Sequence, residues 1–118
     1  LWMQDQPQVA QVLHPALPGS PGHAHWQRDC TAAAGLFSVV FDARYTAAQV
    51  DAFVDALQLF KIGYSWGGPV SLAVPYDVQA MRPAGRWLHQ GGLVRLAIGL
   101  EDPQDLIDDL RQAVQQMF

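Results

Sequence analysis

The sequence predicts an α+β domain in which a four-stranded, mostly antiparallel sheet has helices packed on one face. Four short runs are rich in β-branched or alternating apolar residues, and two longer segments repeat apolar residues at helical spacing. Their order is roughly β-β-α-β-β-α, which lacks the βαβ regularity that a parallel sheet would require. The predicted strands span residues 9–13, 36–41, 70–74 and 93–98.

The length fits a single domain over residues 1–118. The chain has a mass of 13.0 kDa, which is enough for one hydrophobic core and too little for two. Half of the residues are hydrophobic and 15% are charged, a composition typical of globular domains. The chain opens with Leu1 and Trp2 rather than Met, so we interpret it as a fragment or a trimmed product.

The first third of the chain is rich in residues that interrupt regular structure. Residues 1–6 are expected to form the end of a helix, which Pro7 terminates before the strand at 9–13. Five prolines and glycines then lie between His14 and His25, so a long loop is expected there. Loops of this length are often functional or pack against a partner.

The first full helix is expected to begin at Thr46 and to end at Gly63. Thr46 and Gln49 have the spacing of a capping box, in which each side chain satisfies a backbone N–H group of the other residue. Apolar residues at helical spacing predict its buried face; these are Val50, Phe53, Val54, Leu57 and Phe60. Residues 75–92 are expected to form turns and loops, because Pro75 and several glycines lie in that segment.

A second helix is expected near the C-terminus. Asp102 is the predicted N-cap, Pro103 the first helical residue, and Asp105 a favourable charge in the first turn. The predicted buried stripe consists of Leu106, Ile107, Leu110, Val114 and Met117.

Composition argues against several classes of function. The net charge is −4 and the seven Lys and Arg residues are scattered, whereas nucleic acid binding requires clustered cations. The longest nearly apolar run, from Thr31 to Phe41, is far too short to cross a membrane. Cys30 is the only cysteine, so no disulfide forms within the chain, and a cytoplasmic location is expected.

Arg95 is the first candidate for a binding residue. It lies in the middle of an apolar strand, and alternation places it on one face with Leu93 and Ala97. A guanidinium there must reach water or find a carboxylate. An internal ion pair with one of the eleven acidic residues, or a solvent-facing arginine, would be purely structural. The functional interpretation is a two-pronged clamp for a carboxylate ligand.

The segment Tyr64-Ser65-Trp66-Gly67-Gly68 is the second candidate. It combines an aromatic wall, a hydroxyl group and glycines between a predicted helix and a strand. An ordinary helix-to-strand connection, with Trp66 packed on the core, is the structural alternative. The glycine pair matches no phosphate-binding motif.

Other chemistries have weak support. His14, His23 and His25, with Asp29, form the one metal-like grouping, but no third ligand has convincing spacing, so no metal site is predicted. The serines lie in no nucleophile motif, and Cys30 has no visible activating neighbour. No catalytic residue is therefore predicted within this chain.

Three ordered blocks resemble the C-terminal part of the Cys/Met-metabolism enzymes that use pyridoxal phosphate. The clearest two are the run from Phe60 to Gly68 and the run from Leu93 to Asp102. The third covers His14 to Asp29, with Gly35-Leu36-Phe37-Ser38 beyond it. Ser65-Trp66-Gly67-Gly68 resembles the β-lyase branch, because the γ-synthase and γ-lyase branches usually carry Leu at the position of Trp66. Pro69-Val70 departs from the Tyr-Glu or Phe-Glu that more commonly follows the glycines.

The resemblance implies the C-terminal small domain of a two-domain subunit with the aspartate-aminotransferase fold type, assembled as a homo-oligomer. The N-terminal domain would supply the Schiff-base lysine, and pyridoxal phosphate would bind to the full-length enzyme rather than to this fragment. Arg95 would hold the substrate α-carboxylate with help from Ser65, while Trp66 and Tyr64 would form walls of the pocket. The implied reaction cleaves cystathionine into homocysteine, pyruvate and ammonia.

Two alternatives remain open beside this enzyme fragment, which is expected to be inactive on its own. One is a small module that binds an anion through Arg95, and the other is an interaction domain that pairs through an apolar surface. The position of Lys61, the only lysine, favours the fragment, because in the family no Schiff base forms there.

Overall fold

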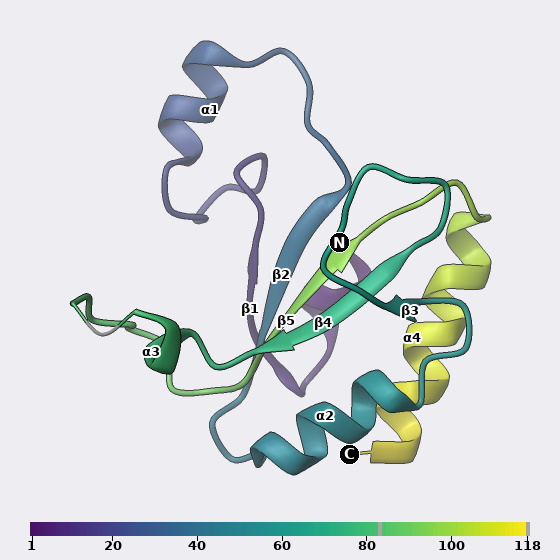
Figure 1. Cartoon of the computed structure of the whole chain (residues 1–118). Helices are drawn as coiled ribbons and strands as arrows, with labels where there is room; N and C mark the ends of the chain where they lie inside the picture. The colour runs from purple at the N-terminus through teal and green to yellow at the C-terminus, as the bar shows by residue number, and fades with distance from the viewer. Residues whose placement is uncertain (83, 118) are drawn as a thin grey trace.

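A five-stranded mixed sheet forms the centre of the molecule in a computed structural model that describes residues 1–82 and 84–117 (Figure 1). The strands are β1 (Val9–Leu13), β2 (Leu36–Phe41), β3 (Lys61–Ile62), β4 (Leu72–Tyr76) and β5 (Leu93–Ala97). They lie in the order β1-β2-β5-β4-β3, and every neighbouring pair is antiparallel except β3 and β4. The predicted α+β class is confirmed, but the predicted strand count of four is wrong.

Two longer helices cover one face of this sheet. They are α2 (Ala47–Asp55) and α4 (Pro103–Met117), which pack against each other, and α2 also contacts β4 and β5. Figure 1 shows both helices on the same side of the sheet, whereas two short helices project beyond it. The short helices are α1 (His23–Asp29) and α3 (Val78–Met81), and a 3₁₀ turn, η1 (Trp2–Asp5), precedes β1.

The core lies between the sheet and these two helices. Phe53 of α2 is fully buried, and its ring meets the ring of Phe41 edge-on with the centroids 5.1 Å apart. Val39, Val94 and Leu96 from the central strands are also completely buried. Alternate residues of β2 and β5 therefore face the helices, and the residues between them face the opposite side of the sheet.

The capping box at the start of α2 is present as predicted. The Gln49 backbone N–H donates to the Thr46 hydroxyl at 3.2 Å, and the Thr46 N–H donates to the Gln49 side chain at 3.0 Å. The predicted end of this helix at Gly63 is wrong, because α2 ends at Asp55. Leu57 and Phe60 are buried nonetheless, but they lie in the connection after the helix.

A carboxylate from a distant part of the chain explains why α2 stops early. Asp109 of α4 is buried, and its oxygens accept hydrogen bonds from the backbone N–H groups of Gln58 and Leu59, both at 2.8 Å, and of Phe60 at 3.3 Å. These N–H groups are thus satisfied without an α-helix. The chain then enters β3, where the Lys61 N–H donates to Ser71 O at 2.9 Å.

The C-terminal helix begins as predicted. An Asp102 oxygen accepts from the N–H groups of Gln104 at 2.8 Å and Asp105 at 3.4 Å, which is the bonding of an N-cap. Its buried residues include Leu106, Leu110 and Val114 from the predicted stripe, while Ile107 and Met117 are only partly buried.

Two other segments are more regular than expected. The loop predicted for residues 14–25 ends at Gly22, which adopts a left-handed conformation (φ 80°), and α1 starts at His23. The segment 75–92 begins with the end of β4 and contains α3, whose first turn is capped by Asp77 through a 3.1 Å bond from the Ala80 N–H. None of the helices in the described residues is long and apolar enough to cross a membrane.

Candidate functional site

Arg95 lies in the middle of β5, on the sheet face that α2 and α4 leave open. Its register partners are Ser38 of β2 and Val74 of β4, so these side chains share that face. Arg95 is partly buried, whereas Val94 and Leu96 on either side are fully buried against the helices. The central strand therefore holds the base of this side chain in a fixed position.

The guanidinium of Arg95 contacts the main chain of the turn that follows β3. Its Nη2 atom donates to Tyr64 O at 2.5 Å and to Ser65 O at 3.3 Å. Carbonyl groups orient the guanidinium but carry no net charge. The Nε atom is buried and has no hydrogen-bond partner within the described residues. Buried N–H groups in proteins are nearly always paired, so this donor is an exception that a bound acceptor would remove.

The positive charge of Arg95 is not neutralised within the described part of the chain. Ion pairs join Arg28 to Asp29, Arg44 to Asp42 and Arg111 to Asp108. No carboxylate of residues 1–82 and 84–117 forms such a pair with Arg95. The internal ion pair that the sequence left open as an alternative is therefore not formed there.

Aromatic rings surround the guanidinium. Its central carbon lies 5.8 Å from the centroid of Trp66 and 5.6 Å from that of Tyr76, both within the range of cation–π attraction. Tyr64 meets Tyr76 edge-on at 6.1 Å. Trp66 is 65% exposed, so it does not pack into the core as the structural alternative required.

The turn that carries these residues is tied to the end of β5. The backbone N–H and the hydroxyl of Ser71 donate to the two carboxylate oxygens of Glu101 at 2.7 and 2.8 Å. The Ser71 hydroxyl also accepts from the Gly99 N–H at 2.8 Å. The hydrogen bond from the Ser71 backbone is the main cause that lowers the pKa of Glu101, against partial desolvation that raises it. Glu101 therefore anchors the turn in its charged form.

Gly67 completes the turn with a backbone that other residues rarely adopt. Its φ is 73°, in the left-handed region where a Cβ atom is unfavourable. The sequence pattern Trp66-Gly67-Gly68 thus supplies both the aromatic side chain and the sharp reversal behind it.

A groove of about 430 Å³ opens beside Arg95 on the same face of the sheet. It runs from β1 and β2 to α3 and the loop beyond it. Its lining residues are Leu13, Ser38, Tyr76, Val78, Met81, Arg82, Trp87, Leu93 and Arg95.

The structure brings together all four residues that the sequence singled out. Tyr64, Ser65 and Trp66 surround the Arg95 guanidinium, through their carbonyl oxygens or their rings. Sequence reasoning missed Tyr76, Ser71 and Glu101. The alternation of β4 could have placed Tyr76 on the face of Arg95, but no local signal links Ser71 to Glu101, which lies 30 positions further along the chain.

The histidines of the N-terminal loop have a structural role. His14 Nε2 lies 2.9 Å from Ala34 O, and His23 Nδ1 lies 2.8 Å from Pro15 O. Within the described residues, no three His, Cys, Asp or Glu side chains are grouped so that they could hold a metal ion.

An unpaired arginine among aromatic rings, at the edge of a groove, is typical of a protein that binds a small carboxylate. The model of the Cys/Met metabolism PLP-dependent enzymes matches residues 1–115, so the chain belongs to that family.

Individual relatives share most of this chain. It is 51% identical over 112 residues to a cystathionine beta-lyase of Salmonella typhimurium, a match that covers 92% of this chain and 28% of the relative. It is 38% identical to an L-alanine/L-glutamate racemase of Wolbachia pipientis (98% and 29% covered) and 34% identical to a cystathionine gamma-lyase of Bos taurus (96% and 29% covered). The chain thus spans less than a third of the length of these relatives.

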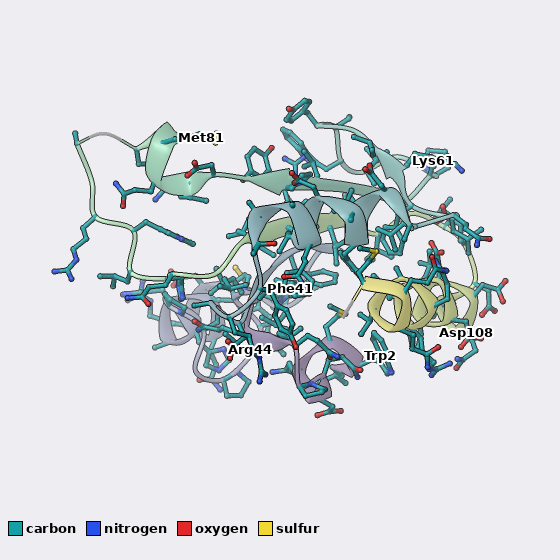
Figure 2. The ribbon with its side chains drawn as sticks, turned by 90° about the horizontal axis from the view of Figure 1, so that it is seen from below. Trp2, Phe41, Arg44, Lys61, Met81 and Asp108 are labelled. Atoms are coloured by element: carbon teal, nitrogen blue, oxygen red, sulfur yellow. The ribbon has the colours of Figure 1, made fainter. Side chains whose placement is uncertain are left out.

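The residues of this chain do not by themselves fit the aldehyde of pyridoxal phosphate. That group requires a lysine amine, and the only lysine of the sequence is Lys61. Lys61 is exposed in the edge strand β3, where its amine donates to Gln58 O at 2.6 Å. Lys61 does not line the groove beside Arg95, whereas Met81 does. Figure 2 shows Lys61 and Met81 at opposite ends of the molecule.

Proposed function

We propose that this chain is the C-terminal, substrate-anchoring part of a PLP-dependent lyase that cleaves a carbon–sulfur bond of cystathionine. The observation that carries the proposal is the unpaired guanidinium of Arg95 among Tyr64, Trp66 and Tyr76. The substrate class follows from the name of the relative that is 51% identical. The rest of the longer protein would supply the lysine that this chain lacks at the site.

Arg95 would bind the α-carboxylate of the amino-acid substrate. One edge of its guanidinium is held by the Tyr64 and Ser65 carbonyls, and the buried Nε still lacks an acceptor. A carboxylate beside Nε would satisfy that donor and neutralise the charge. Trp66 and Tyr76 would exclude water from the ion pair, which strengthens it.

The arginine would fix the substrate so that its α-carbon and sulfur-bearing chain reach the cofactor. Pyridoxal phosphate supplies the electron sink for this chemistry when it is bound. The contribution of this chain is positioning, because none of the residues around Arg95 is a base within the described structure. This chain and the rest of the longer protein would therefore each contribute half of one active site. The isolated chain is expected to be inactive.

Replacement of Arg95 by lysine in the full-length protein tests this function. Lysine keeps the charge but cannot form two parallel hydrogen bonds, so kcat/KM for cystathionine should fall by about 100-fold or more. The melting temperature should change little, and Arg111→Lys, which alters a surface ion pair, should leave both values unchanged. A normal kcat/KM with a lowered melting temperature would assign Arg95 a purely structural role.

A γ-lyase is the second candidate, favoured by the 34% identity to the bovine enzyme. The two reactions differ in which carbon–sulfur bond breaks, so the keto acid formed decides between them. Pyruvate indicates β-cleavage and 2-oxobutyrate indicates γ-cleavage. We expect pyruvate, because this chain has Trp66 at the position where the γ-synthase and γ-lyase branches usually carry leucine. Trp66→Leu should raise the share of 2-oxobutyrate.

We further propose that the protein forms homo-oligomers and acts in the cytoplasm. Several large apolar side chains are exposed on the segment 62–70 and beside it, namely Ile62, Tyr64, Trp66, Val70 and Leu100. Contiguous apolar surface of this kind usually has a partner, and the isolated chain should therefore self-associate. Light scattering at several concentrations tests this, and a monomer at all of them would contradict it.

A further inference from the structure

Two arginines line the groove beside β5, and no acidic residue does. Arg95 lies in its floor and Arg82 follows α3. The chain as a whole has a net charge of −4, so the groove is positive on an otherwise negative protein. The side chains of Arg82 and Arg95 form no ion pair with any carboxylate of the described residues. This separation of charge favours an anionic ligand with more than one acidic group.

The loop that carries Arg82 is held in place by Gln79. The Gln79 side chain donates to Gly85 O at 3.4 Å and accepts from the Trp87 N–H at 3.1 Å. The Trp87 ring, which also lines the groove, lies 4.7 Å from the ring of His89. The nearest acidic residue, Asp77, caps the first turn of α3 and lines a neighbouring pocket instead. Arg82 therefore remains free to bind a ligand.

We propose that Arg82 binds the second, distal carboxylate of a dicarboxylate substrate whose α-carboxylate is bound by Arg95. This rests on the proposed function, since cystathionine carries one carboxylate at each end. The volume of about 430 Å³ lies within the usual range for small-ligand sites, about 300–1,000 Å³. The apolar side chains of Leu13, Val78 and Leu93 line the same groove and suit the methylene and thioether groups between the two charges. Arg82 is thus a specificity-determining residue.

Two thioether substrates separate this role from that of Arg95 in the full-length protein. Cystathionine has the distal carboxylate and S-ethylcysteine lacks it. Arg82→Gln should lower kcat/KM for cystathionine by about tenfold, mainly through KM, and leave S-ethylcysteine within about twofold of wild type. Arg82→Lys should recover part of the loss. Arg95→Gln should impair both substrates.

Arg86→Gln is the matched control, because it removes the same charge from the same loop but Arg86 does not line the groove. It should change neither substrate. Equal effects of Arg82→Gln on both substrates, or no effect on either, would overturn the inference while leaving the proposed function intact.

A binding measurement keeps the two proposals separate. If the wild-type protein cleaves neither thioether, the proposed function fails, and calorimetric titration with glutarate and butyrate then decides the inference alone. Tighter binding of glutarate that Arg82→Gln abolishes supports a distal carboxylate site. Equal affinities for the two acids, or a glutarate preference that survives Arg82→Gln, overturn it.

Discussion

The two faces of the sheet differ in how their side chains are covered. On the helix-covered face, Val39, Phe41, Val94 and Leu96 are almost completely buried. On the open face, Arg95 and Ser38 in the same strands are only partly buried, although Val40 and Leu93 on that face are buried. The residues alternate between the faces along the same two strands, so each strand contributes to both.

This difference separates the residues that stabilise the domain from those that are available to contact a ligand or another part of the protein. The helix-covered face is largely covered within the chain, because α2 and α4 pack on it. The open face has an arginine whose buried Nε has no acceptor among residues 1–82 and 84–117, and it has aromatic side chains such as Trp66 that remain exposed. Substitutions of the buried residues that face the helices should therefore affect folding, and those of Arg95 and the exposed aromatic residues should affect binding.

The largest expected effect comes from removing a ring of the covered face. Phe53→Ala should lower the free energy of unfolding of the chain by about 4 kcal/mol, because Phe53 is fully buried against Phe41. Tyr76→Ala removes a ring of similar size from the open face and should cost about 1 kcal/mol. Urea denaturation measures the free energy of unfolding of both variants. Equal decreases for Phe53→Ala and Tyr76→Ala would contradict the division between the faces.

The carboxylate that ends α2 should have the next largest effect. Asp109→Ala leaves three backbone N–H groups without their acceptor, and the expected loss is about 3 kcal/mol. The neighbouring Asp108 points outward on α4 and pairs with Arg111 at the surface (Figure 2). Asp108→Ala should cost less than about 0.5 kcal/mol. If the two variants were equally stable, the burial of Asp109 would have no energetic role.

The smallest expected effect belongs to the carboxylate that anchors the turn before β4, and it depends on pH. The pKa of Glu101 in the folded protein lies below the ordinary value of 4.5, chiefly because of the hydrogen bond from the Ser71 N–H. The resulting stabilisation is therefore complete above about pH 4.5 and is lost as the pH falls through the lowered pKa. Glu101→Gln should be about 1 kcal/mol less stable than wild type at pH 7, and the difference should vanish in acid. Thermal unfolding over a range of pH checks this, and a constant difference would contradict it.

The sequence predicted those features that depend on neighbouring residues. The capping box of Thr46 and Gln49 and the N-cap at Asp102 were found because the partners lie two or three positions apart. The strands 9–13 and 36–41 were predicted with their observed bounds, and the strand from Leu93 was one residue too long. Alternation alone placed Arg95 on one face with Leu93 and Ala97, and the structure shows that this face is the one opposite α2 and α4.

Features that depend on distant residues were missed. The apolar spacing of Leu57 and Phe60 predicted a longer helix. Nothing near them shows that Asp109 accepts from the backbone N–H groups of residues 58–60, which lie 49 to 51 positions away. The two residues of β3 were assigned to that helix for the same reason, because their pairing with β4 exists only in the folded sheet. Likewise, the sequence identified Arg95 but not Tyr76 beside it.

The place of β5 in the sheet has a consequence for the order of events during synthesis. This strand lies between β2 and β4 and pairs with both, yet of the five strands in the described residues it leaves the ribosome last. Before residue 93 emerges, β1–β2 and β3–β4 are separate pairs whose inner edges are open to pairing with other chains. The strand that closes these edges is also the strand that carries Arg95, so the surroundings of Arg95 form only when those edges become paired.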